Sequence, residues 1–247
     1  MFNFFSKKKS EPQQLFFHTD VHCHVVPGVD DGSPDVDTSV ELIERMESWG
    51  LRRIIATPHM TQDTFENTPD ILDPPLFELK EALEKKDSKV NLSRSAEHRI
   101  DDFFVEQLEK GLILPFPGNF ILVENSFMQE PWNLDQFIFD LKLKGYKPIM
   151  AHPERFVYYQ NNRKRYDDLH RAGNLFQINL VSLSGYYGKQ CKATAEYLLE
   201  KGYVAFIGTD LHHHKHADSI EAYLASRDYR RLAEKAPRLL NDTIPAE

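Results

Sequence analysis

The amino-acid sequence predicts an α/β fold in which parallel strands and helices alternate to form a closed or nearly closed barrel. Short apolar runs alternate seven times with segments of helical periodicity, which indicates parallel strands joined by right-handed crossovers. The strand-like runs are nearly all apolar, as expected when both faces of a sheet are covered. The sequence lacks the glycine-rich phosphate turn of many open sheets. A chain of 247 residues suits one such barrel.

Seven apolar runs are predicted to be strands. They cover residues 16–25, 53–57, 90–96, 120–123, 147–151, 175–180 and 204–208. The run at 90–96 is less apolar than the others. Each run has the length of a buried strand and is followed by polar residues or glycine, which marks its end.

Seven segments are predicted to be helices, because apolar residues recur in them at intervals of three and four. They cover residues 33–49, 75–86, 102–110, 134–144, 166–172, 189–201 and 219–236. In the first helix Ser33 is the predicted N-cap and Pro34 the first helical residue. Glycines at 50, 111, 145 and 202 directly follow helices and stop them. The stretch 61–75 is the longest predicted loop, and loops of this length often cover active sites.

The composition limits the classes of function that fit. Apolar residues make up 41% of the chain and charged residues 28%, and the net charge is −8, which argues against nucleic-acid binding. No apolar stretch reaches the roughly 18–20 residues that span a bilayer, so no transmembrane segment is predicted. The only cysteines, Cys23 and Cys191, argue against a disulfide framework and indicate a reducing, cytoplasmic location.

The chain is predicted to form one domain over residues 15–247, preceded by a flexible tail over residues 1–14. The start of the tail is too short in its apolar part for a signal peptide. Its aromatic residues Phe2, Phe4 and Phe5 stand beside three consecutive lysines at 7–9. An alternative interpretation of this patch is therefore a weak contact with a membrane or a partner.

Histidines and carboxylates gather where the predicted strands end, which is the rim that carries the active site in α/β barrels. His22 and His24 are separated by one residue, so both rings lie on one face of a strand, and Cys23 between them is predicted to turn into the core. The full set of candidate metal ligands is His22, His24, Asp31, His59, Glu97, Glu124, His152, Asp210 and His212. Nitrogen and oxygen donors without thiolate predict two or three divalent ions, such as manganese, iron, cobalt or zinc.

The histidines at 213, 214 and 216 are predicted to belong to a solvated, loosely structured run rather than to the metal site. Each is one member of a run of polar residues, and such runs usually face water.

These segments resemble the polymerase-and-histidinol-phosphatase (PHP) superfamily of metal-dependent enzymes. More narrowly, the segments 20–32 (DVHCHVVPGVDDG), 151–155 (AHPER), 177–179 (QIN) and 182–185 (SLSG) resemble the CpsB/CapC/YwqE-type bacterial protein-tyrosine phosphatases. The resemblance extends over residues 19–217. It implies a distorted TIM-like (β/α)7 barrel of the PHP type with a trinuclear metal centre, for which manganese is the first expectation and iron, cobalt or zinc the alternatives.

The resemblance also implies how the ligands are shared. His22, His24 and Asp210 would hold one ion, and Glu97 would bridge it to a second ion held by Glu124 and His152. Asp31, His59 and His212 would hold the third ion. Arg155 corresponds to an arginine that contacts phosphate.

The sequence departs from the family pattern in two places. His98 and Arg99 follow Glu97 where the family usually has aromatic residues, and Arg94 and Arg99 become alternative phosphate contacts. A second arginine that some members carry after the last metal motif is absent, so Lys215 or His216 would have to take its place.

The implied activity is hydrolysis of phosphotyrosine on bacterial tyrosine kinases that regulate capsular and exopolysaccharide synthesis. A metal-bridged water would lose its proton near neutral pH and attack phosphorus. A cysteine-dependent mechanism is excluded, because it needs arginine six residues after the cysteine, where this chain has Val29 and Tyr197.

Two other hypotheses remain. In the first, the protein is another PHP-type phosphoesterase, such as a histidinol-phosphate phosphatase. In the second, it is a non-catalytic metal-binding regulator of a kinase. The complete ligand set argues against a non-catalytic role.

Overall fold

The strands form two sheets in the computed structural model, which describes residues 12–246, and every strand pair in these sheets is parallel. The smaller sheet has the order β1-β2-β4 and the larger one the order β3-β5-β6-β7-β8-β9. The strands are β1 (Thr19–Asp20), β2 (Arg53–Ala56), β3 (His59–Met60), β4 (Asn91–Arg94), β5 (Glu97–Arg99), β6 (Phe120–Glu124), β7 (Lys147–Ala151), β8 (Leu175–Asn179) and β9 (Val204–Gly208). The α/β class and the parallel strands are therefore confirmed.

Backbone hydrogen bonds connect the two sheets where the segments that follow β1 and β9 meet. Asp210 N donates to His22 O at 2.7 Å, and His24 N donates to Leu211 O at 2.9 Å. At the other edge the chain itself passes from β2 to β3 and from β4 to β5 through short connections, and Ser95 N donates to Ala56 O at 2.8 Å where β4 and β2 end. The ladders belong to two separate sheets.

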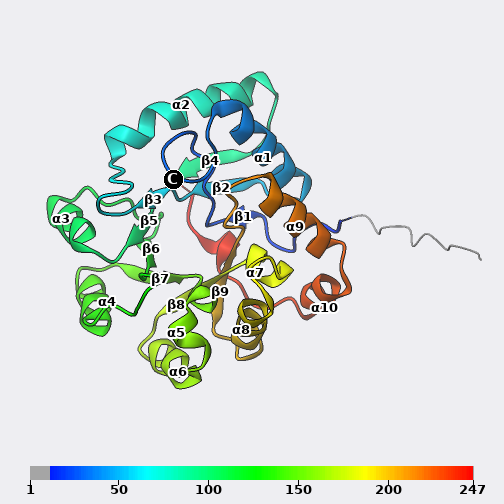
Figure 1. The fold of residues 1–247 in the computed structure, drawn as a ribbon. Helices are drawn as coiled ribbons and strands as arrows, with labels where there is room; N and C mark the ends of the chain where they lie inside the picture. Colours follow the sequence, from blue (N-terminus) through cyan, green and yellow to red (C-terminus); the bar gives the residue numbers. More distant parts are fainter. Residues whose placement is uncertain (1–11, 247) are drawn as a thin grey trace, which may run out of the picture.

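Helices surround the strands (Figure 1). They are α1 (Val36–Ser48), α2 (Pro69–Lys85), α3 (Asp102–Lys110), α4 (Leu134–Leu143), α5 (Val157–Gln160), α6 (Arg163–Arg171), α7 (Leu180–Ser184), α8 (Lys189–Glu200), α9 (His214–Leu224) and α10 (Arg227–Lys235), with 3₁₀ turns η1 (Pro153–Arg155) and η2 (Asn241–Thr243). The short helices α5 and α7 were not predicted, because four or five residues are too few to show a periodic pattern. None of the described helices is long and apolar enough to cross a membrane.

Several predicted boundaries were wrong for identifiable reasons. Helix α1 begins after Asp35, whose carboxylate accepts a hydrogen bond from Thr38 N, so Ser33 is not the cap. Helix α2 begins at Pro69, six residues before the predicted start, and its buried leucines begin at Leu72. The loop predicted over residues 61–75 therefore ends at residue 68.

The remaining differences concern elements that are shorter than predicted or interrupted. The first strand is only β1, because its regular ladder with β2 covers Thr19 and Asp20 alone, and the backbone that follows bonds on one side to Thr57 and on the other to the segment after β9. The run at 90–96 ends at Arg94, and a second strand starts at Glu97. The last predicted helix is two helices, since Ser226 caps α10 by accepting from Tyr229 N.

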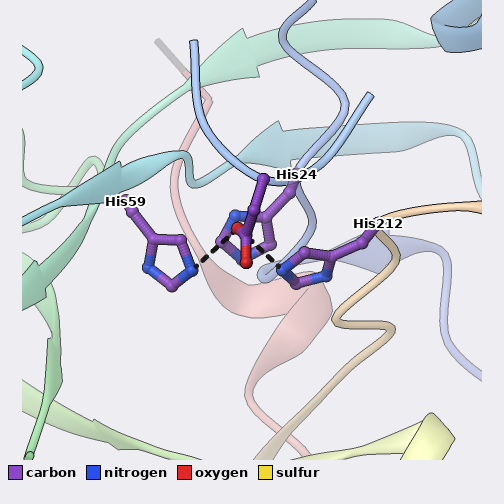
Figure 2. Close-up of side chains that lie close together, drawn as sticks. His24, His59 and His212 are labelled. Atoms are coloured by element: carbon purple, nitrogen blue, oxygen red, sulfur yellow. Dashed lines mark ion pairs between the residues drawn. The ribbon is translucent and has the colours of Figure 1, made fainter. Parts of the chain in front are cut away.

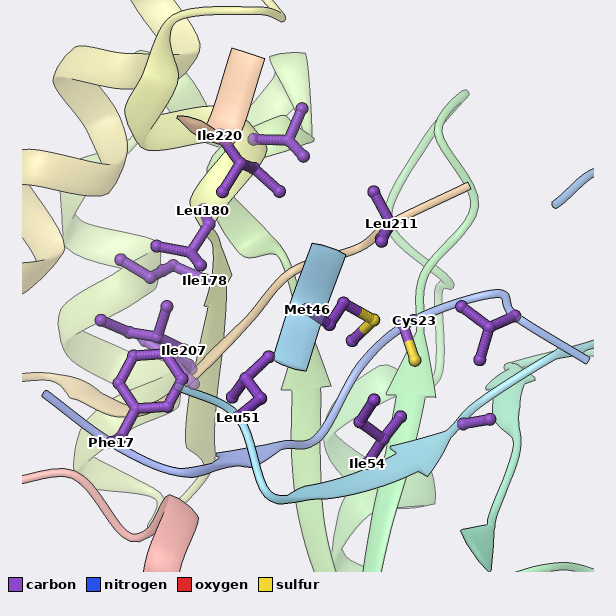
Figure 3. Packing of buried hydrophobic residues seen from close by; sticks show 14 of the residues in the cluster. Phe17, Cys23, Met46, Leu51, Ile54, Ile178, Leu180, Ile207, Leu211 and Ile220 are labelled. Carbon is purple, nitrogen blue, oxygen red and sulfur yellow. The ribbon is translucent and has the colours of Figure 1, made fainter. Parts of the chain in front are cut away.

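The core has two hydrophobic clusters. The larger one lies between strands and helices, and Figure 3 shows part of it, with Cys23, Met46 and Ile54 among its members. Cys23 is fully buried there, which confirms the prediction that it turns into the core. The smaller cluster joins side chains from the strand segments to the C-terminal segment: Val21, Ile55, Phe116, Leu122, Ile149, Ala151, Phe206 and Ile244.

The C-terminal segment closes the amino end of the strands. The buried side chain of Asn241 in η2 accepts a hydrogen bond from Ile207 N and donates to Thr19 O and Ile207 O. Arg53, the first residue of β2, donates to Ile244 O at 2.7 Å. The polar candidate residues lie at the opposite, carboxyl ends of the strands.

The predicted tail over residues 1–14 is described only in part. Residues 12–14 are exposed, and Gln13 N donates to Leu224 O at 3.2 Å. Residues 1–11 lie outside the described residues, and so does the aromatic and basic patch at 2–9.

We predict that Asn241→Ala lowers the free energy of unfolding by about 2–4 kcal/mol, because it leaves buried backbone groups of Thr19 and Ile207 without partners. Urea denaturation followed by circular dichroism measures the change. Asn161→Ala, at an exposed helix end, is the matched control and should change stability little. Equal unfolding free energies for the two variants would contradict this role of Asn241.

Candidate metal centre

All nine predicted ligands meet at the carboxyl ends of the strands. They form four overlapping groups, and within each group the candidate ligand atoms lie within 4.8 Å of one another. The groups are His24, Asp31, His59 and His212; His22, Glu97 and His152; His22, His24 and Asp210; and His59, Glu97 and Glu124. The first group contains His24 in addition to Asp31, His59 and His212, the three residues that the resemblance assigns to the third ion. Glu97 belongs to two groups, as do His22, His24 and His59.

The rings of His22 and His24 are fixed by hydrogen bonds on their far sides. His22 Nδ1 donates to Gln177 Oε1 at 2.8 Å, and His24 Nδ1 donates to Asp30 Oδ2 at 2.7 Å. These bonds assign the tautomer of each neutral ring and leave Nε2 as the ligand atom. The two Nε2 atoms are only 3.2 Å apart. Two Nε2 lone pairs at this separation repel each other, so either a proton shared between the rings or a metal cation must offset the repulsion.

A second convergence lies around Asp31. Figure 2 shows the rings of His24, His59 and His212 turned toward a common point, and dashed lines mark ion pairs there. Asp31 Oδ1 lies 3.4 Å from His59 Nε2 and 3.6 Å from His212 Nε2. His212 Nδ1 donates to the backbone oxygen of Asp210 at 3.0 Å, so its Nε2 is also the free ligand atom.

Several ligand atoms are buried without a hydrogen-bond partner in the described structure. They are His59 Nδ1, Glu97 Oε2, Glu124 Oε1, His152 Nδ1 and Asp210 Oδ1. A buried carboxylate oxygen without a partner is costly, and such groups are rare in folded proteins. Divalent cations would bind these oxygens and nitrogens directly, so the donor set fits a metal centre of the kind that the sequence predicts.

The carboxylates of this centre favour positively charged groups beside them, and the pKa values of its side chains show this effect. Burial alone would lower the pKa of His22, but Glu97 and Asp210 outweigh it and raise the pKa to about 9. Burial would raise the pKa of Asp210, yet the charges of Arg155 and His22 hold it well below its usual range. Burial and the negative charge of Glu97 raise the pKa of Glu124 to about 7. Protons therefore compete with metal ions for these ligands.

The backbone permits this crowding at particular positions. A Cβ on Gly208 would lie 2.5 Å from the Cβ of His22 and 2.9 Å from Gln177 Nε2, so only glycine lets the two side chains approach β9. His152 and Asp210 adopt φ angles of 31° and 53°, in the left-handed region that non-glycine residues rarely use. Strain of this kind is concentrated at functional sites.

A pocket of about 350 Å³ opens over the centre. Its wall consists of Asp31, His59, Thr61, Thr64, Phe65, Arg99, Glu124, Phe127, Arg155, Tyr187, His212, His213 and His216. The loop after β3 contributes three of these residues, so part of the predicted covering loop does line the site.

Two guanidinium groups face this pocket. Arg155 forms an ion pair with Asp210 at 3.0 Å, and its guanidinium lies between the rings of Phe127 and Tyr187, 4.8 and 4.2 Å from their centroids. Arg99 Nε donates to Glu124 Oε2 at 2.9 Å. Phe127 and Tyr187 were not predicted, because an isolated aromatic residue in a loop has no distinguishing spacing.

The structure resolves the departure at His98 and Arg99. His98 is buried and links β6 to the connection between α3 and β6, since its Nδ1 donates to Leu122 O and its Nε2 accepts from Leu114 N. Arg99 lines the pocket. Arg94 instead pairs with Asp73 outside the pocket wall.

The prediction of a solvated histidine run was wrong for two of its members. His216 is buried, and its Nδ1 donates to Asp210 O at 3.1 Å. His213 caps α9, and both His213 and His216 line the pocket. Lys215 is exposed and is not part of the wall, so His216 is the better substitute for the missing arginine.

We predict that Gln177→Leu weakens binding of divalent manganese by about 10–100-fold, because His22 loses the acceptor that fixes its ring. Titration calorimetry on chelator-treated protein measures the affinity, and circular dichroism checks the fold. Gln190→Leu, at an exposed position on α8, makes the same chemical change away from the centre and should leave the affinity as it was. Undiminished affinity in folded Gln177→Leu would refute this role.

Comparison with known proteins identifies relatives over most of the chain. Residues 18–228 match the family model described as capsular polysaccharide synthesis, CpsB/CapC. The chain is 34% identical over 197 residues to tyrosine-protein phosphatase YwqE of Bacillus subtilis, covering 79% of this chain and 78% of the relative. It is 30% identical over 194 residues to the putative tyrosine-protein phosphatase CapC of Staphylococcus aureus, covering 78% and 76%.

Solved structures agree with these matches. One from a study of YwqE from Bacillus subtilis and CpsB from Streptococcus pneumoniae, described as metal-dependent tyrosine phosphatases, superposes with a TM-score of 0.77 at 33% identity, covering 90% of this chain and 94% of the other. An amidohydrolase from Mycoplasma synoviae shares the fold alone, with a TM-score of 0.57 at 12% identity, covering 95% and 90%. The chain therefore belongs to the CpsB/CapC family of capsular polysaccharide synthesis.

Proposed function

We propose that this protein is a metal-dependent protein-tyrosine phosphatase that acts on tyrosine-phosphorylated bacterial protein kinases and so regulates capsular or exopolysaccharide synthesis. The observation that carries the proposal is the convergence of nine metal-ligand candidates beneath a pocket with two guanidinium groups. The names of the relatives YwqE, CapC and CpsB support the same activity.

The nine residues His22, His24, Asp31, His59, Glu97, Glu124, His152, Asp210 and His212 would hold two or three divalent ions, manganese first. When bound, such ions withdraw charge from phosphoryl oxygens and acidify a water molecule, which is the chemistry that phosphate-ester hydrolysis requires. The fold would be a distorted (β/α)7 barrel of the PHP type, with residues 15–247 as one domain that works in the cytoplasm.

Arg155 is the residue that we assign to the phosphate. Its planar guanidinium can bind two phosphoryl oxygens side by side, and the rings of Phe127 and Tyr187 hold it over the pocket. Its ion pair with Asp210 ties the phosphate contact to the metal centre. A phenolate leaving group has a pKa of about 10 and departs without a strong acid.

We predict that chelator-treated protein is inactive and that manganese restores hydrolysis of a phosphotyrosine peptide derived from a bacterial kinase. Release of inorganic phosphate measures turnover, with histidinol phosphate and a phosphoserine peptide of matched sequence as comparison substrates. Equal or faster turnover of histidinol phosphate would favour the alternative, a small-molecule PHP phosphoesterase. Full activity in the chelator would rule out metal dependence.

We predict that Arg155→Lys lowers kcat/KM for the phosphotyrosine peptide by about 100-fold. The lysine ammonium keeps a positive charge opposite Asp210, but it lacks the two side-by-side N–H donors with which a guanidinium binds two phosphoryl oxygens. Arg94→Lys is the control, because Arg94 pairs with Asp73 outside the pocket, and it should keep normal kinetics. A loss of less than about threefold in Arg155→Lys would contradict this assignment.

A further inference from the structure

The loop 125–133, between β6 and α4, carries apolar side chains that the catalytic proposal does not use. Among residues 12–246, Trp132 and Met128 are the most exposed of the large apolar residues, at 96% and 88%. Neither packs against the two hydrophobic clusters of the described structure. A single exposed apolar residue is ordinary, whereas several that gather beside a functional pocket indicate a binding surface.

These two side chains belong to a surface that borders the pocket over the candidate metal centre. Phe127, next to Met128 in the chain, is partly exposed and lines that pocket. Its ring contacts the ring of Phe156 with the centroids 5.5 Å apart, and Val157, the next residue, is exposed. We call the four exposed residues Phe127, Met128, Trp132 and Val157 the apolar rim.

Polar contacts hold the loop that carries most of the apolar rim. Tyr158 donates its hydroxyl hydrogen to Ser126 O at 2.8 Å. Glu130 accepts two hydrogen bonds from Arg165 of α6, at 2.8 and 2.9 Å, and Arg165 also pairs with Asp135 in the first turn of α4 at 2.8 Å. The loop is therefore fixed on its polar side while its apolar side chains face solvent. A surface that is ordered in advance loses less conformational entropy when it binds a partner.

The apolar rim is within reach of the residues that flank a phosphotyrosine bound in the pocket. Met128 is one residue from Phe127 and Trp132 is five residues away, so both lie within roughly 18 Å of Phe127 along the chain. An extended peptide advances roughly 3.3–3.6 Å per residue. A few residues on one side of the phosphotyrosine therefore suffice to reach the rim.

We propose that the apolar rim binds large apolar side chains that lie within about five residues of the phosphotyrosine in the protein substrate, an inference that rests on the phosphatase activity proposed above. The rim is continuous with the substrate pocket through Phe127, which belongs to both. This continuity assigns the rim to the substrate rather than to a second copy of this chain. The flexible Met128 and the broad ring of Trp132 suit apolar side chains of varied shape.

Peptide kinetics on the full-length, manganese-loaded protein test this inference. Two phosphotyrosine peptides differ only in carrying leucine or serine at each of the three positions on both sides of the phosphotyrosine. We expect kcat/KM to be about tenfold higher for the leucine peptide, through a lower KM, because leucine removes apolar surface from water at the rim.

The double variant Met128→Ser and Trp132→Ser should lose this preference for leucine. The small aryl phosphate p-nitrophenyl phosphate has no flanking residues to place on the rim. Its turnover should be the same in the double variant and the original protein, because neither replaced residue lines the pocket. A defect in folding or in the metal centre would instead lower the turnover of all three substrates.

A matched control separates the apolar rim from exposed apolar surface in general. Leu143 of α4 and Phe77 of α2 are exposed and lie outside the pocket wall. Leu143 ends α4, and because β6 and β7 are parallel, this end of the helix leads back to the amino ends of the strands. The double variant Leu143→Ser and Phe77→Ser should therefore keep the preference for leucine.

Three results would overturn this inference alone: no preference for leucine in the original protein, an undiminished preference in the rim variant, or equal losses in the rim and control variants. Sedimentation velocity adds a fourth, since a dimer that the rim variant converts to a monomer would assign the rim to a second copy. Inactivity of the manganese-loaded protein on p-nitrophenyl phosphate and on both peptides would overturn the proposed function, and this inference with it.

Discussion

Repulsion among buried ligand atoms is the constraint on which the rest of this structure depends. Nine histidines and carboxylates gather in four groups that share members, and several of their atoms have no hydrogen-bond partner. The rings of His22 and His24 bring two Nε2 atoms within 3.2 Å of each other. Such an arrangement is unfavourable unless cations offset it, and the polypeptide must hold it in place against that repulsion.

The fold provides this support from both ends of the strands. At the amino end, Asn241 and the C-terminal segment tie β1 and β9 together. At the carboxyl end, β8 contributes no ligand of its own, but Gln177 holds His22, and Asn179 donates to Asp210. Strand β8 thus serves to orient candidate ligands that other segments carry, which is the usual role of residues just outside a metal centre.

The sequence predicted which residues converge at the candidate site better than it predicted the elements that carry them. Alternation along a strand places His22 and His24 together, and the barrel rule places the remaining candidates at the same rim, so local pattern and topology sufficed. The limits of β1 and the division of the third strand depend on hydrogen bonds between distant segments, such as Asp210 to His22, which no local pattern reveals. Phe127 and Tyr187 became recognisable only once their rings were seen on either side of Arg155. Burial of His216 depends on the backbone oxygen of Asp210, again a tertiary contact.

Anomalous X-ray diffraction at the manganese absorption edge, from crystals equilibrated with manganese, tests the central claim most directly. If the nine residues form a multinuclear centre, two or three anomalous peaks will lie among them, within bonding distance of the His22, His24 and His59 rings. Peaks confined to exposed carboxylates elsewhere, with none inside the ring of nine residues, would contradict the account.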